Sequence, residues 1–154
     1  MKKTTVLTLA TMVVSLIFAT GAFAFFGGKF KTVKPENGVL KIEVADVDDG
    51  KAHYFKARAD DGIEVSFFVL KSQDGVIRAA VDACDVCYRA GKGYVQAGDY
   101  MVCENCGQKF ASNRINVVKG GCNPAPLERQ VQGEHLVVSM AEINANSWYC
   151  QYKK

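Results

Sequence analysis

The chain has 154 residues, of which 49% are hydrophobic, and a formal net charge of +3 at pH 7. This balance excludes the strongly basic surface that nucleic-acid binding requires, so we expect no nucleic-acid partner. The length is sufficient for one domain with its own hydrophobic core.

Residues 1–24 have the features of a secretory signal. Lys2 and Lys3 give a positive start, an apolar stretch covers residues 6–19, and Ala22-Phe23-Ala24 is a small-x-small cleavage site. Cleavage removes two lysines and no acidic residue, which lowers the formal charge from +3 to +1. An uncleaved segment would instead anchor the chain in a membrane. We therefore expect a periplasmic or otherwise exported protein, membrane-anchored if the signal stays in place.

After the signal we expect a linker over residues 25–35 and one small domain over residues 36–152. The domain is predicted to be mainly β, because stretches of alternating or β-branched residues are separated by Asp-Gly and other turns. The expected strands cover residues 39–44, 53–57, 63–70, 76–81, 115–118 and 135–140. Residues 141–147 are expected to form one or two helical turns near the C-terminus.

Two C-x-x-C pairs separated by fifteen residues are the main chemical signal in the sequence. Two such turns can bring four thiolates together in the tetrahedral arrangement that suits zinc, iron or a small iron–sulfur cluster. The spacing matches the short end of the C-x2-C-x15–20-C-x2-C pattern, and glycines between the pairs permit a hairpin. We therefore predict a Cys-rich metal-binding loop region whose ligands are Cys84, Cys87, Cys103 and Cys106.

The two turns differ in the residue that follows the second cysteine. Gly107 follows Cys106 and accepts a positive φ, which lets backbone N–H groups turn toward a sulfur, as in rubredoxin and zinc-ribbon loops. Tyr88 takes that place after Cys87. Neither pair is followed by His, which excludes attachment of a c-type haem.

Disulfide bonds are the alternative use of these residues, because an exported chain with six cysteines meets an oxidising compartment. Bonds within each C-x-x-C pair would close short, strained loops that stabilise little. Cys122, which follows two glycines, is a candidate fifth ligand or a disulfide partner of Cys150. A structural zinc-binding or disulfide-stapled interaction module therefore stays open as a second interpretation.

Several short segments resemble the FtrD-like family of membrane-associated iron–sulfur proteins over about residues 53–140. They are Phe67–Leu70, Asp74-Gly75 with Arg78, Asp82–Tyr88, Gly93–Gln96, Met101–Gly107, Phe110 and Gly120–Pro124. The resemblance implies a role in bacterial ferrous-iron uptake, with electron transfer as the activity and inner-membrane iron-transport components as partners. It also implies that the family's cysteines correspond to the four C-x-x-C residues and extend to Cys122.

The second pair also resembles a Rieske loop. Cys103-x-x-Cys106-Gly107-x-x-Phe110 follows the Rieske pattern Cys-x-x-His-Gly-x-x-Phe with Cys in place of His. This resemblance implies a compact β scaffold that holds a site between two loops. The sequence shows no Ser/His/Asp set and no phosphate-binding loop, so we favour electron transfer or metal binding over an enzymatic activity.

The expected cofactor is an iron–sulfur cluster or mononuclear iron, with zinc as the alternative. The apolar stretch is not preceded by a twin arginine, so export as an unfolded chain is expected, and this favours an ion acquired after export. Zinc has no redox chemistry, so a zinc protein would not carry electrons.

Overall fold

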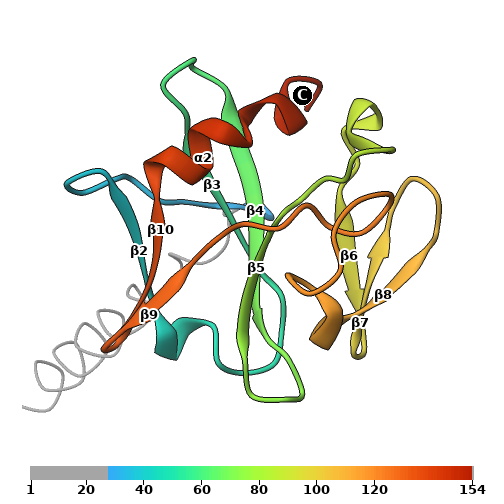
Figure 1. Cartoon of the computed structure of the whole chain (residues 1–154), viewed down its shortest axis with the longest axis horizontal. Helices are drawn as coiled ribbons and strands as arrows, with labels where there is room; N and C mark the ends of the chain where they lie inside the picture. Colours follow the sequence, from blue (N-terminus) through green and yellow to red (C-terminus); the bar gives the residue numbers. More distant parts are fainter. Residues whose placement is uncertain (1–27, 154) are drawn as a thin grey trace, which may run out of the picture.

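The computed structural model describes residues 28–153 (Figure 1). The expected signal over residues 1–24 lies outside these residues, as does the start of the expected linker. Within the described part of the chain, no helix combines the length and apolar character needed to cross a membrane.

The described chain is mainly β, which confirms the predicted fold class. Its ten strands are β1 (Lys31–Thr32), β2 (Val39–Glu43), β3 (His53–Arg58), β4 (Glu64–Lys71), β5 (Ile77–Val81), β6 (Tyr94–Ala97), β7 (Tyr100–Cys103), β8 (Lys109–Ala111), β9 (Gln130–Gln132) and β10 (His135–Ser139). The described helices are α2 (Met140–Ala145) and the short 3₁₀ segments η1 (Val44–Asp46), η2 (Tyr88–Ala90), η3 (Ser112–Arg114) and η4 (Ser147–Cys150).

The strands form three small sheets. Their orders are β1-β3-β4-β5, β2-β10-β9 and β6-β7-β8. All neighbouring strands are antiparallel except β1 and β3. In Figure 1 the β6-β7-β8 sheet and the β2-β10-β9 sheet lie on opposite sides of β3, β4 and β5. The β6-β7-β8 sheet, whose strand β7 ends at Cys103, is thus a separate layer attached to a central scaffold.

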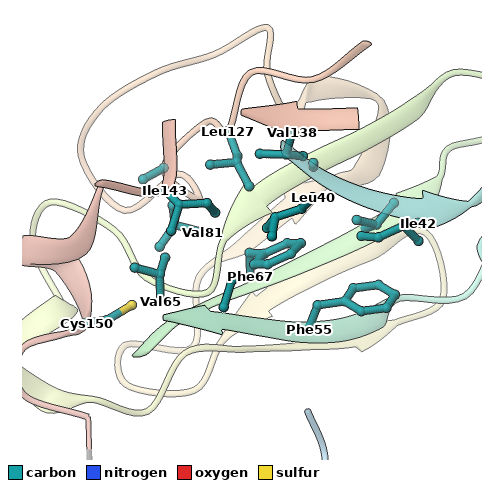
Figure 2. Packing of buried hydrophobic residues seen from close by; sticks show 14 of the residues in the cluster. Leu40, Ile42, Phe55, Val65, Phe67, Val81, Leu127, Val138, Ile143 and Cys150 are labelled. Atoms are coloured by element: carbon teal, nitrogen blue, oxygen red, sulfur yellow. The ribbon is translucent and has the colours of Figure 1, made fainter. Parts of the chain in front are cut away.

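Strand β4 is buried on both faces and therefore supports two hydrophobic clusters. Phe67 points into the larger cluster, where its ring stacks on Phe55 at a centroid distance of 5.6 Å. Figure 2 shows these two rings beside Leu40, with Cys150 at the edge of the cluster. Phe68, the next residue, points the opposite way into the smaller cluster. This alternation follows from the two-residue period of a strand.

The smaller cluster carries the cysteines. It contains Phe68, Leu70, Ala80, Cys84, Tyr94, Met101, Cys103 and Ile115. Cys84 and Cys103 are therefore part of the hydrophobic packing between the central sheet and the β6-β7-β8 sheet, and burial of the apolar residues around them holds the two C-x-x-C turns together.

The segment 115–118, predicted to be a strand, is a turn in the structure. Asn116 adopts a φ of +66°, which interrupts an extended backbone. Its side-chain amide nevertheless pairs with the backbone of Ala79: Nδ2 donates to the carbonyl at 2.7 Å, and Oδ1 accepts from the N–H at 3.2 Å. The asparagine side chain thus takes the place that a strand backbone would have beside β5.

The N-terminal part of the described chain packs against the domain before residue 36. Lys31 in β1 lies opposite Phe55 in β3, and the N–H of Val33 donates to the carbonyl of Lys56 at 2.9 Å. Lys29 Nζ donates to the carbonyl of Tyr94 at 2.8 Å. Residues expected to form a linker therefore contact the β6-β7-β8 sheet directly.

Candidate metal centre

Five cysteines meet where the smaller hydrophobic cluster reaches the surface. Cys84 follows β5, Cys87 precedes η2, and Cys103 is the last residue of β7. Cys106 lies in the turn between β7 and β8, and Cys122 lies in the loop before β9. Strand pairing of β6 with β7 places Tyr94 opposite Cys103, which brings the chain just after the first pair against the second pair.

The sulfur atoms form two groups of three. The Sγ atoms of Cys84, Cys87 and Cys103 all lie within 4.8 Å of one another, and so do those of Cys87, Cys106 and Cys122. The prediction that the two C-x-x-C turns converge is confirmed. The grouping differs from the expected foursome, because Cys106 is grouped with Cys122 and Cys87 belongs to both groups.

The five clustered cysteines differ in how far their side chains are exposed to solvent. Cys84 and Cys103 are only 1% and 2% exposed. Cys87 and Cys122 are half-buried, and Cys106 is exposed. The sulfur cluster therefore begins in the hydrophobic interior and ends at the protein surface.

Backbone and side-chain N–H groups point at these sulfurs. The N–H of Cys87 donates to Cys84 Sγ at 3.2 Å, and the side-chain amide of Asn105 donates to Cys87 Sγ at 3.3 Å. The turn after Cys106 has the expected positive φ at Gly107, +74°. The next backbone N–H, from Gln108, lowers the pKa of the Cys106 thiol by hydrogen bonding. Such donors stabilise thiolate sulfur.

Burial acts in the opposite direction on two other thiols. It raises the pKa of Cys103 to about 11, although backbone N–H groups of Cys106 and Asn105 oppose the rise. Desolvation also raises the pKa of Cys122 to about 12. These two thiols therefore stay protonated at neutral pH unless a cation displaces the proton, and metal ions do so.

A buried carboxylate and its hydrogen-bond donors lie next to the first C-x-x-C turn. The carboxylate of Asp82 is fully buried; it accepts from the N–H of Tyr94 at 2.7 Å and from Lys153 Nζ at 2.6 Å. Gly93 packs so closely on this carboxylate that a Cβ atom there would lie 2.2 Å from Asp82 Oδ2. No local sequence pattern predicts this arrangement, because Lys153 is distant from Asp82 in the chain.

Tyr94 connects the smaller hydrophobic cluster to the loop that carries Cys122. Its side chain is fully buried, and its hydroxyl donates to the carbonyl of Cys122 at 2.6 Å. Its ring lies 6.2 Å from Phe68 and 6.1 Å from Phe110. The aromatic rings keep water from the inner side of the sulfur cluster, and the hydroxyl fixes the loop that carries Cys122.

Cys122 and Cys150 do not pair in this structure. All six cysteines lie in the described part of the chain and are free, so the C-x-x-C disulfides are not formed either. Cys122 Sγ lies 4.0 Å from Cys87 Sγ. Cys150 belongs to the larger hydrophobic cluster instead, where its sulfur accepts from the N–H of Ser66 at 3.4 Å.

The kind of ligand atom determines which metal groups the site suits. All five candidate ligands are thiols, which select zinc, iron and iron–sulfur centres over hard cations such as Mg²⁺ or Ca²⁺. The residues therefore fit zinc, iron or an iron–sulfur group.

Comparison with known families agrees with this chemistry. Residues 47–149 match the family model described as "Membrane iron-sulfur containing protein FtrD-like". The chain belongs to the FtrD-like family. The matched region, about two thirds of the chain, contains all five clustered cysteines and confirms the family predicted from the sequence motifs. None of the curated proteins compared with the chain matches it.

Among solved structures, similar ones include the quaternary ammonium Rieske monooxygenase CntA. Its apo form has a TM-score of 0.45 at 14% identity, with 65% of this chain and 32% of the monooxygenase chain covered. An inhibitor complex has a TM-score of 0.45 at 13% identity, with 65% and 30% covered. The complex with gamma-butyrobetaine has a TM-score of 0.44 at 13% identity, with 64% and 30% covered. This FtrD-like chain thus spans about a third of those chains.

Proposed function

We propose that this FtrD-like protein is exported and holds an iron centre through its clustered cysteines, exchanging electrons beside a ferrous-iron transporter of the inner membrane. The observation that carries this proposal is the course of the sulfur cluster from the interior to the surface. Cys84 and Cys103 are buried, whereas Cys106 is exposed. A centre that is held in the interior and reaches the surface can exchange electrons with a docked partner.

The proposed ligands are Cys84, Cys87, Cys103 and Cys106, with Cys122 as a fifth thiolate. An iron or iron–sulfur group bound there would supply one-electron chemistry at a potential set by net charge, N–H···S bonds and solvent exposure. The chain provides hydrogen bonds to sulfur and protection from solvent. Asn105 and the backbone N–H of Cys87 donate to sulfur, and Tyr94 and Phe110 exclude water from the inner side.

The surface beside the cluster supports contact with a partner. Val86, between the two cysteines of the first turn, is 65% exposed, and Cys106 of the second turn is also exposed. A partner that docks over Val86 and Cys106 would therefore lie next to the sulfur cluster. We infer that the partner is a membrane-bound component of the iron-transport system, as the family's link to iron uptake implies.

The deciding experiment is elemental analysis and redox titration of protein matured in the periplasm with its own leader. We expect bound iron, visible absorption from sulfur-to-iron charge transfer, and a reversible redox wave. The double variant Cys103→Ser/Cys106→Ser, which lacks a ligand in each group of three, should abolish all three. Cys150→Ser is the matched control, because Cys150 lies in the other hydrophobic cluster and should leave them unchanged.

Zinc in place of iron would give a different result. Stoichiometric zinc with no visible absorption and no redox wave would overturn the electron-transfer role, since zinc has no redox chemistry. The protein would then be a structural thiolate–zinc module.

A further inference from the structure

We propose that the cysteine cluster holds two metal ions that share the sulfur of Cys87. The inner position is formed by Cys84, Cys87 and Cys103, and the outer position by Cys87, Cys106 and Cys122. This inference rests on the proposed metal-binding function but not on its redox role, so the two can be tested separately.

The distances support two positions. Around a tetrahedral ion with metal–sulfur bonds of about 2.3 Å, neighbouring sulfurs lie about 3.8 Å apart. Each group of three has all its Sγ atoms within 4.8 Å, so small side-chain movements suffice to bring them onto one ion. Cys87 Sγ and Cys122 Sγ are already 4.0 Å apart. The five sulfurs do not form one such group, which argues against a single ion that gathers all of them.

A small cavity marks the inner position. Its volume is about 10 Å³, and all three inner cysteines line it together with Asp82 and Tyr94. A space of this size accepts one water-sized group. Cys106 and Cys122, both in the described part of the chain, are absent from its lining. The inner ion therefore has room for a fourth ligand inside the protein.

The outer position opens to solvent. Cys106 is exposed, and Cys122 is held by the hydrogen bond from the Tyr94 hydroxyl to its own carbonyl. Water can complete the coordination of an ion there. Open coordination is characteristic of metal sites that exchange ligands, whereas closed sites are structural. The outer position thus suits an ion that enters or leaves, and the inner position suits one that stays.

Ligand number gives a further reason for two ions. One tetrahedral ion takes four sulfurs and would leave a fifth unused, although all five lie in the two groups of three. A shared Cys87 sulfur uses a second lone pair and lets five sulfurs provide six metal–sulfur bonds.

Anaerobic titration of the metal-free protein with Co²⁺ tests the proposal. Native mass spectrometry should show two ions per wild-type chain. The paramagnetic resonance signal of high-spin Co²⁺ should rise during the first equivalent and fall during the second, because a bridging sulfur couples the two spins. Cys122→Ser and Cys106→Ser should each bind one ion and keep its signal. Cys150→Ser should behave as the wild type.

Three results would overturn the proposal. They are one Co²⁺ per wild-type chain, two ions whose signals simply add, or two ions retained in Cys122→Ser. Cys106 and Cys122 are not in the deep interior, so their serine variants are expected to fold, and circular dichroism checks this. Loss of the inner ion is tested with Cys84→Ser. A protein that binds two Co²⁺ ions but shows no redox wave with iron would refute only the electron-transfer role.

Discussion

Asn105 Nδ2 lies 3.3 Å from Cys87 Sγ, so a side chain between the cysteines of the second turn donates a hydrogen bond to a sulfur of the first. The bond links two turns that are 15 residues apart in the chain. It also reaches the one sulfur that belongs to both groups of three. Asn105 is therefore placed to influence the whole metal centre without being a ligand.

Asn105→Ala should weaken metal binding by about 10- to 100-fold, the usual effect of losing a hydrogen bond to a ligand. The measurement is a competition titration against a chelator of known affinity. Asn113→Ala is the control, because Asn113 is an exposed asparagine in η3. Equal affinities in the wild type and Asn105→Ala would show that this bond does not position Cys87.

Gly93→Ala should destabilise the domain more than Gly98→Ala. Both glycines have positive φ, +78° and +58°, so each alanine pays about 1–2 kcal/mol for a left-handed backbone. At Gly93 the new Cβ also meets the carboxylate of Asp82, whereas no atom lies within 4 Å of a Cβ at Gly98. Urea unfolding of both variants separates the clash from the backbone strain. Similar losses in the two would mean that Asp82 moves freely.

Lys153→Met should cost about 3–5 kcal/mol in the free energy of unfolding at neutral pH, because it leaves the buried carboxylate of Asp82 without its cation. Burial raises the pKa of Asp82, and Lys153 opposes this rise. Lys31→Met is the matched control, since Lys31 and Asp46 form an exposed pair at 3.3 Å. The control should change stability by less than about 1 kcal/mol. Thermal and urea unfolding of the metal-free proteins give both values.

Tyr94→Phe should lower stability by about 1–3 kcal/mol, because the carbonyl of Cys122 loses a half-buried hydrogen bond. It should also weaken the second Co²⁺ equivalent more than the first, since the loop that bears Cys122 is loosened. Tyr100→Phe, at an exposed tyrosine, serves as the comparison. A uniform loss of affinity for both ions would contradict a separate outer position.

Metal removal should destabilise the protein, because ions that bind only the folded state add to its stability. At a free metal concentration 100 times the Kd, one site contributes about 2.7 kcal/mol. We expect chelation to lower the melting temperature of the wild type and of Cys150→Ser. The double variant Cys103→Ser/Cys106→Ser, which lacks a ligand in each group of three, should show no further decrease on chelation. A wild-type melting temperature that does not change when the chelator is added would rule out coupling between the metal site and folding.

Much of the fold and of the site could be read from local patterns. Alternation placed the strand 39–43, and a run of β-branched and aromatic residues placed the strand 64–71, each to within one or two residues. The C-x-x-C spacing indicated that the two turns converge, since each motif forms a turn by itself. The strands β6, β7 and β8 are absent from the expected strands, because each is only three or four residues long, glycines flank them, and their burial comes from the neighbouring sheet.

Some features are determined by the sequence alone, and others only by the tertiary structure. Thiol chemistry, the family motifs and the β pattern are local properties, so the order of residues is sufficient to establish them. The grouping of Cys106 with Cys122, the separation of Cys150 and the burial of Asp82 against Lys153 are not local. They depend on how three sheets pack around β4, whose alternate side chains enter different clusters. Long-range packing of this kind results from the burial of many side chains together, so no single motif specifies it.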